Sequence, residues 1–545
     1  MKWILIFYNI LFISLYYISV HGNSISQEHE IVISLANYDN SSRNGQAFHN
    51  YSLLNNSSRT FINITNVPPE VSFIIIQVHA QESNVTLIFN GTQTSKISGY
   101  NVGMQINSSD ISDTIISIEN NNYRDVSVLV AVVAYTSDAP IPGGCNMEFE
   151  VEIAPFQKLN QTDAIVRVDA QPASEPKIND KQNSCDKNLI EYQSYRLYIP
   201  RGDFTNETYF SLIIKMLTVD GIIDNGVVSP NISASPLSRI YSAYPGTGSV
   251  YVIIATFDNY SAAYVPQFSY ACGPVSNSDT CYLLKTSLSK FLCAVIFFIG
   301  VFFIFIGYRY LTLEIMLLGS ITGGILGYII LNTIGILSST WQISLSITIG
   351  LLVGIFCSYF YCKKRPCISI LQASFSLGAL IASIIYLGIP DNSIYHNNAT
   401  FWIIYAAICL IVTMILCTCQ MSSIMICYSI LGAYAIILPF DYWLGSNLKY
   451  IIINTIRRIS VSGFDSAIIN PPIQTTDIVL SAFWIVLAIF GFYMQCRGLR
   501  GRSPFSSCNT KYTTIASRNR YPTLSNPRGG RRVLVLTGDD HIFRA

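Results

Sequence analysis

The sequence predicts a β-rich ectodomain of two antiparallel, sandwich-like units, followed by an all-α bundle of seven transmembrane helices that is unlike a G-protein-coupled receptor. Three observations support this fold class. Only 12% of the 545 residues are charged, against roughly 25% in an average soluble domain. Seven apolar runs long enough to span a bilayer follow one another within residues 289–496. Short runs rich in Val, Ile and Phe, many with alternating polarity, fill the chain before them.

Residues 1–22 predict a signal peptide. Lys2 precedes a long apolar run, and "VHG" offers small residues for cleavage after Gly22. Because the run is long for a signal core, an uncleaved anchor is the alternative. Either outcome delivers the residues that follow into the secretory lumen.

Residues 23–144 and 145–283 are predicted to form the two β-sandwich-like units. Strands are expected at apolar runs such as "SFIIIQVHA" and "DVSVLVAVVAY" in the first unit, and "SYRLYIP", "YFSLIIKML" and "SVYVIIATF" in the second.

Glycosylation sequons are dense in this half of the chain and predict exposed, modified asparagines. A further sequon lies in an outer loop of the membrane part. The sequons are at Asn40, Asn50, Asn55, Asn56, Asn63, Asn84, Asn90, Asn107, Asn160, Asn206, Asn231, Asn259 and Asn398.

Four ectodomain cysteines predict two disulfides: Cys145, Cys185, Cys272 and Cys281. Four cysteines allow three connectivities. Proximity makes Cys272–Cys281 the easiest closure, which leaves Cys145–Cys185, but the sequence alone does not decide between the connectivities.

Transmembrane helices are expected at residues 289–310, 312–336, 342–361, 367–389, 400–419, 421–440 and 476–496. Short connections predict tight hairpins between the first and second helices and between the fifth and sixth. Lys and Arg near the turns after helices one and three and in the tail place those parts in the cytosol, so the N-terminus is extracellular. The basic, Ser- and Thr-rich tail, residues 497–545, is expected to be disordered and cytosolic.

One outer loop departs from this charge pattern. Residues 441–475 contain Lys449, Arg457 and Arg458 on the outer side. Because "LKYIIINTIRRISV" is amphipathic, we expect this segment to lie along the membrane surface.

Glycines in the membrane helices predict close helix packing rather than a pore. Helices in lipid associate through close backbone approach, which small residues permit, and ion pathways usually need ionisable groups that the helix centres here lack. Equal spacing of Gly324, Gly378 and Gly432 predicts three repeated hairpins and an unpaired seventh helix. The packing glycines are Gly319, Gly323, Gly324, Gly327, Gly350, Gly354, Gly378 and Gly432.

Neither catalytic motifs nor metal-ligand spacings are present in the sequence, so we expect no enzyme, cofactor or metal. The tripeptide "RGD" at 201–203 offers an integrin motif, but a glycan on Asn206 would obstruct it. A G-protein-coupled receptor is disfavoured because the third helix ends in "YFYCKKRP" instead of D-R-Y, and the seventh lacks N-P-x-x-Y.

The segments "YTSDAPIPGGCNMEFE" and "SAAYVPQFSYACGPVSNSDTC", together with the glycine-patterned helices, resemble the transmembrane 7 superfamily member 3 family. Its membrane part is related to the transmembrane protein 198 group. The resemblance implies a non-enzymatic glycoprotein of the plasma membrane, with an endoplasmic reticulum pool, that supports cell survival and attenuates stress. Only Cys145 and Cys272 are carried over, as disulfide cysteines.

The expected partners are the lipid bilayer and an unidentified protein or ligand at the ectodomain, with no nucleic acid. A cell-surface receptor with a ligand-binding ectodomain is the first alternative, and a channel or transporter is the second.

Overall fold

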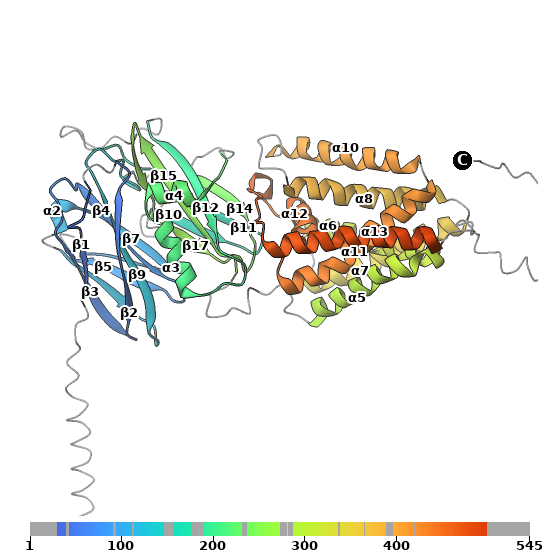
Figure 1. Cartoon of the computed structure of the whole chain (residues 1–545), viewed down its shortest axis with the longest axis horizontal. Coiled ribbons are helices and arrows are strands. Elements are labelled where there is room, and N and C mark those ends of the chain that lie inside the picture. The colour runs from blue at the N-terminus through green and yellow to red at the C-terminus, as the bar shows by residue number, and fades with distance from the viewer. Residues whose placement is uncertain are drawn as a thin grey trace, which may run out of the picture.

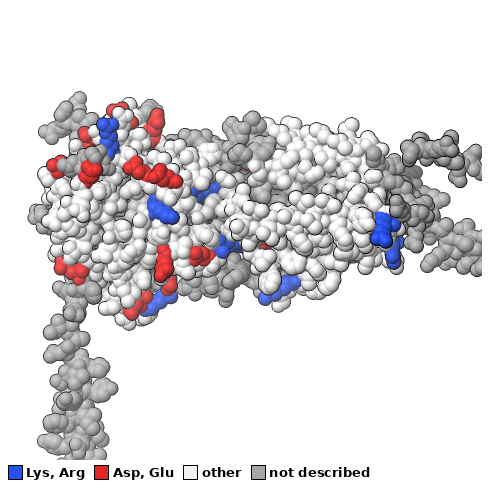
Figure 2. All heavy atoms as spheres, viewed as in Figure 1, with Lys and Arg blue, Asp and Glu red and all other residues white. Residues whose placement is uncertain are grey.

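The computed structural model describes residues 30–498 apart from 40–42, 91–93, 112–113, 146–155, 177–184, 186–188, 231–236, 273–280, 282–286, 336–337, 364–365, 389–395 and 419. The signal peptide, Asn40, Asn231 and the tail beyond residue 498 lie outside the described residues. The β-rich ectodomain sits at one end of the helical bundle (Figure 1). The bundle surface in view is largely uncharged, whereas acidic and basic side chains are spread over the ectodomain (Figure 2).

The first β unit consists of two facing sheets. One sheet has the order β2-β9-β4-β7, and the other has the order β1-β3-β8-β5-β6. β1 pairs with β3 in parallel, because the chain crosses to the other sheet through β2 between them. The elements are β1 (Glu30–Ser34), β2 (Gln46–Leu54), β3 (Ser58–Thr65), β4 (Phe73–Ala80), β5 (Val85–Asn90), β6 (Thr94–Gly99), β7 (Asn101–Asn107), α2 (Ser108–Ile111), β8 (Ile115–Asn120) and β9 (Val126–Tyr135).

Strands β4 and β9 are buried on both faces. Ile74 and Ile76 point into the core of the first unit, while Phe73 and Ile75 on the opposite face join a core shared with the second unit. Side chains alternate between the two faces of a strand. A sheet covered on both sides therefore needs the nearly continuous apolar runs that the sequence has here.

The second unit combines two sheets with two helices. Its sheets have the orders β10-β11-β14 and β13-β12-β15-β16, and β17 also pairs with β15. The elements are β10 (Gln157–Gln161), β11 (Ile165–Ala170), β12 (Glu191–Tyr198), α3 (Asn206–Lys215), α4 (Val219–Asn225), β13 (Val227–Val228), β14 (Ser238–Ser242), β15 (Ser249–Phe257), β16 (Tyr260–Ala263) and β17 (Gln267–Ser269).

The strand expected at "YFSLIIKML" is wrong, because most of this stretch forms helix α3. Tyr209, Leu212 and Ile213 are buried, which is the spacing of one helix face. Met216 and Leu217 continue the apolar face beyond the helix end. This face packs into the core shared by the two β units. Its apolar residues match helical periodicity better than alternation.

A buried histidine lies in a polar cluster beside that shared core. His79 is fully buried, and its Nδ1 lies 2.8 Å from Oδ1 of Asn101. The other ring nitrogen, Nε2, lies 3.1 Å from Oε1 of Gln77. The hydroxyl of Tyr209 on α3 donates to the same Asn101 oxygen over 2.6 Å, which links the two units. Burial lowers the pKa of His79 to about 4, against the hydrogen bond to Asn101.

We expect acid to destabilise the ectodomain through this histidine. Between pH 6.5 and about 4 the unfolded chain binds a proton at His79 that the folded chain does not. Stability is therefore lost as pH falls through this window, by about 2 kcal/mol between pH 7 and pH 5. Thermal unfolding of the full-length protein at both pH values measures the loss. His79→Gln should remove most of this pH dependence, whereas His49→Gln, at an exposed position, should leave it intact.

The bundle contains six helices long and apolar enough to cross a membrane, and α5 adds a shorter apolar helix, among the described residues. Two short 3-10 turns and one amphipathic helix complete it. The elements are α5 (Ser287–Phe305), η3 (Gly307–Arg309), α6 (Leu311–Ile334), α7 (Ser339–Cys362), α8 (Pro366–Gly388), α10 (Asn398–Cys417), α11 (Gln420–Leu444), α12 (Tyr450–Ser460), η4 (Phe464–Ser466) and α13 (Thr475–Gly498).

The hairpins predicted between the first and second helices and between the fifth and sixth are wrong, because these helices do not pack along their length. α6 packs mainly against α7, and α8 mainly against α10, while α11 packs against α5 and α13. A short connection only keeps two helix ends close together. The helix faces that carry glycine decide which helices pack along their length.

Each predicted packing glycine faces a neighbouring helix. A Cβ atom on Gly319 would lie 2.9 Å from Cα of Gly354, and Gly323 and Gly327 face Val353 and Ile349 of α7. These contacts bring the backbones of α6 and α7 together.

The three equally spaced glycines face different helices. A Cβ atom on Gly324 would lie 3.6 Å from the main-chain oxygen of Ser346 in α7. A Cβ atom on Gly378 would lie 3.0 Å from Cα of Cys409 in α10. At Gly432 it would lie 2.8 Å from Cβ of Phe303 of α5. Gly300 of α5, which was not among the predicted packing glycines, meets the same stretch of α11.

Candidate functional site: the junction of ectodomain and bundle

The outer loop between α11 and α13 joins the second β unit directly. Ile468 in this loop forms a parallel bridge with Tyr241 of β14. Its N–H donates to the Ile240 carbonyl over 2.9 Å, and its carbonyl accepts from Ser242 N over 3.0 Å. The loop thus extends the membrane-proximal sheet, and α13 begins a few residues later.

Helix α12 lies between the two parts of the protein (Figure 1). Ile451 packs into the bundle core, so the apolar face is covered as an amphipathic helix requires. The polar face meets the ectodomain: Arg457 donates to the carbonyl oxygens of Ala243 and Asp163, each over 2.8 Å. The neighbouring Arg458 donates to the Tyr386 hydroxyl over 3.1 Å. The helix is amphipathic as expected, but the ectodomain covers the polar face that we expected to lie at the membrane surface.

A second arginine reaches across from the ectodomain. Arg196 of β12 is buried, and it donates to the Asn470 carbonyl over 2.8 Å. The hydroxyl of Tyr198 donates to the same oxygen over 2.7 Å. The Arg196 guanidinium lies over the ring of Tyr241, 5.0 Å from its centre. These groups fix the residues just before α13 to the second β unit.

Removing the Arg457 side chain is expected to loosen this junction. Each hydrogen bond from a charged group contributes about 1.5–3 kcal/mol, so Arg457→Met should cost roughly 2–3 kcal/mol. Hydrogen exchange at residues 461–474 of the full-length protein should accelerate. Lys215→Met, at the exposed end of α3, is the control and should leave these rates unchanged. Unchanged exchange in both variants would show that the Arg457 contacts do not hold the loop.

An ion pair is completely buried at the outer end of α11. Nζ of Lys449 lies 3.4 Å from Oδ1 of Asp441, and neither side chain is exposed. Ser446 Oγ donates to the same carboxylate oxygen over 2.5 Å, and the Lys449 N–H donates to the other over 2.5 Å. Burial and the nearby Arg201 charge lower the pKa of Lys449 to about 7, while Asp441 opposes this shift.

The N-terminal end of α13 is hydrogen-bonded to the turn that carries the Asp441–Lys449 pair. Asp477 accepts from the N–H of Asn447 over 2.6 Å and from its side-chain amide over 3.1 Å. It also accepts from the N–H of Gln474 over 2.9 Å. A carboxylate at the third helical position that accepts from the N–H of the residue before the helix, here Gln474, stabilises the start of that helix. Asp477 therefore holds both the start of α13 and the Asp441–Lys449 turn.

The "RGD" tripeptide belongs to this junction. Nη1 of Arg201 donates to the Ser446 carbonyl over 3.3 Å. Oδ1 of Asp203 accepts from the Thr205 N–H over 3.0 Å and from its hydroxyl over 2.7 Å. With Arg201 turned toward the membrane part, this tripeptide is not presented as an exposed integrin loop.

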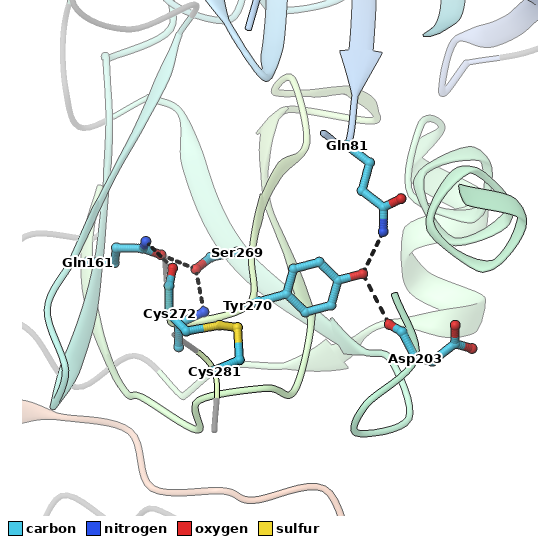
Figure 3. Close-up of a disulfide and its surroundings, with 8 residues drawn as sticks. Gln81, Gln161, Asp203, Ser269, Tyr270, Cys272 and Cys281 are labelled. Carbon is cyan, nitrogen blue, oxygen red and sulfur yellow. Dashed lines mark hydrogen bonds between the residues drawn. A yellow bond between two sulfur atoms is a disulfide. The ribbon is translucent and has the colours of Figure 1, made fainter. Parts of the chain in front are cut away.

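The four ectodomain cysteines form the pairs Cys145–Cys185 and Cys272–Cys281. Figure 3 shows the second pair beside Tyr270, whose hydroxyl donates to the Asp203 carbonyl over 3.1 Å and accepts from Gln81 over 2.7 Å. Gln81 follows β4 of the first unit. The disulfide therefore lies beside a tyrosine that links Gln81 of the first β unit to Asp203 at the junction.

The described sequon asparagines are all exposed or partly exposed, as their modification requires. Among the described residues, no group of three or more His, Cys, Asp and Glu side chains could hold a metal ion. The charges of the outer loop are evident in the sequence, but their partners are not. Apart from Asp441, which lies eight residues from Lys449, those partners are backbone carbonyls and side chains distant in the chain, which leave no local pattern.

The fold and the junction define a multi-pass membrane protein with two immunoglobulin-like domains docked on its helical part. Family profiles match three consecutive parts of the chain: the TM7SF3-like N-terminal immunoglobulin-like domain at residues 39–135, the TM7SF3-like second immunoglobulin-like domain at 140–275, and the TM7S3/TM198-like domain at 293–496. The chain belongs to the transmembrane 7 superfamily member 3 family.

Curated relatives match over most of their length. Transmembrane 7 superfamily member 3 of Homo sapiens is 26% identical over 459 residues, 81% of this chain and 80% of its own. The protein of the same name from Mus musculus is 26% identical over 472 residues, 84% of this chain and 83% of its own.

Proposed function

We propose that the protein is a non-enzymatic membrane glycoprotein that supports cell homeostasis by attenuating cellular and endoplasmic reticulum stress. It would act at the plasma membrane and in the secretory pathway, through protein partners at the ectodomain. Membership of the family supports this role, because the family is linked to cell survival and secretion.

The observation that carries the mechanism is the junction. A flexibly tethered ectodomain would need few specific contacts with its membrane part. Here, Arg196, Arg457 and Ile468 connect the second β unit to the loop that leads into α13. A partner that binds the ectodomain more tightly in one arrangement of the junction would thereby also bias the positions of the helices.

Deletion and rescue test this role. Cells that lack the protein should show stronger induction of stress-response transcripts and more death after calcium depletion of the endoplasmic reticulum. Wild-type protein should rescue them, and Arg457→Met should rescue less at equal expression, whereas Lys215→Met should rescue fully. Equal stress in deleted and rescued cells would contradict the proposed role.

A cell-surface receptor is the second candidate, favoured by the direct path from β14 through Ile468 to α13 and the tail. A receptor that signals through its tail would lose function when residues 499–545 are removed. A homeostasis factor that works through ectodomain partners would keep its function. Rescue of deleted cells by this truncated chain distinguishes the two.

A further inference from the structure

A hollow in the ectodomain combines apolar and polar groups around one sequon. It has a volume of about 500 Å³ and lies between strand β2, strand β9 and helix α3. Tyr51 and Leu53 of β2 line it, although each is 55% exposed. Phe210 of α3 forms its inner wall, with its ring centre 5.7 Å from that of Tyr51. Asn206, the first residue of α3, stands at its edge.

We propose that this hollow seats the core sugars of an N-linked glycan on Asn206, with the first N-acetylglucosamine against the Tyr51 ring. This inference rests on the glycosylation part of the proposed function. Asn206-Glu-Thr208 is a complete sequon. A sugar ring has an apolar face and a polar edge. The hollow offers both an aromatic ring and the hydroxyl of Ser127, which is the cross-strand partner of Leu53.

The exposed residues explain why a cover is needed here. β2 is the end strand of its four-stranded sheet order, and exposed apolar edge strands invite pairing with other chains. A hydrophilic glycan above Tyr51 and Leu53 would hide this edge. A glycan on Asn50 of the same strand would not cover Tyr51 and Leu53, because successive side chains point to opposite faces of a strand. The Asn50 amide is directed to the Val32 carbonyl at 3.5 Å.

Release of the glycan by an amidase under native conditions tests the placement. In the full-length protein, release at Asn206 should be about tenfold slower than at Asn259, which lies in the exposed β15–β16 turn, a ratio equivalent to about 1.4 kcal/mol. Peptide mass spectrometry measures both rates in one sample. Tyr51→Ala should make the rates equal. Tyr123→Ala, at a tyrosine 97% exposed elsewhere, should not change them.

A second pair of variants keeps the aromatic ring in place. Thr208→Ala removes the sequon, while Thr208→Ser retains it. Oxidative footprinting of Tyr51 should increase several-fold in the alanine variant only. An unmodified Asn206, equal release rates in the wild type, or equal labelling of Tyr51 in the two variants would each overturn the proposal. Cross-links from Leu53 to a second copy of the wild-type chain would also overturn it, because they would identify another occupant.

Discussion

Lys449→Met is expected to lower the free energy of unfolding by about 3–5 kcal/mol, the cost of leaving one member of a buried ion pair without its partner. The carboxylate of Asp441 would keep its hydrogen bonds from Ser446 and from the main chain. It would lose the only cation within 4.0 Å among the described residues. Thermal or denaturant unfolding of the full-length protein in detergent measures this loss.

The double variant Asp441→Asn/Lys449→Met separates pairing from packing. The single oxygen of a neutral amide can still accept from either Ser446 or the Lys449 main chain, and methionine fills much of the lysine volume. Buried ion pairs cost much of their attraction in desolvation, so the double variant should recover most of the lost stability. Lys363→Met, at an exposed lysine at the other end of the bundle, should change stability by less than about 0.5 kcal/mol. A double variant as unstable as Lys449→Met would mean that the volume and geometry of the lysine matter, and not its charge.

The sequence predicted the fold class because membrane insertion and strand alternation both leave local patterns. A transmembrane helix must satisfy its backbone within itself, so α6, α8 and α13 are visible as continuous apolar runs. The edge strand β2, with the sequence "QAFHNYSLL", was missed because it is only partly buried and its polarity is mixed.

Helix α3 and the helix pairs of the bundle show where sequence reasoning failed. The apolar residues around Tyr209 and Ile213 suited a strand by composition, but their spacing is that of one helix face, and this face packs against the shared core. The partners of α6 and α10 depended on which glycine faces meet in space, and chain order does not encode that.

The junction was beyond sequence reasoning for a different reason. Lys449 and Arg457 stood out as charges on the wrong side of the membrane. Their partners, Asp441 and the carbonyl of Ala243, come from another helix end and another domain. The excess of Lys and Arg in cytoplasmic loops is a bias over the whole membrane part, so a single basic outer loop can depart from it. Here the fold satisfies the charges within protein, so the exception to the charge rule identified the site.

Adding two methyl groups to α7 is expected to separate it from α6. A Cβ atom on Gly350 would collide with the main-chain oxygen of Ser320, and one on Gly354 would collide with that of Met316. Backbone atoms of a packed helix cannot move aside without shifting the whole helix. Overpacking costs about 1–3 kcal/mol per site, so Gly350→Ala/Gly354→Ala should cost about 4 kcal/mol, and thermal unfolding of the full-length protein in detergent measures it.

Gly324→Ala in the same interface is the matched control. Its Cβ atom would lie 3.6 Å from the nearest atom, which is ordinary contact. Alanine favours a helix by about 1 kcal/mol over glycine, so this variant should be neutral or more stable. The same chemical change thus has opposite signs on two facing helices, because a Cβ atom at Gly350 or Gly354 would collide with the backbone of α6, whereas one at Gly324 would make ordinary contact. If Gly324→Ala destabilised the protein as much as Gly350→Ala, the glycines would act through helix flexibility and close backbone contact would not explain their presence.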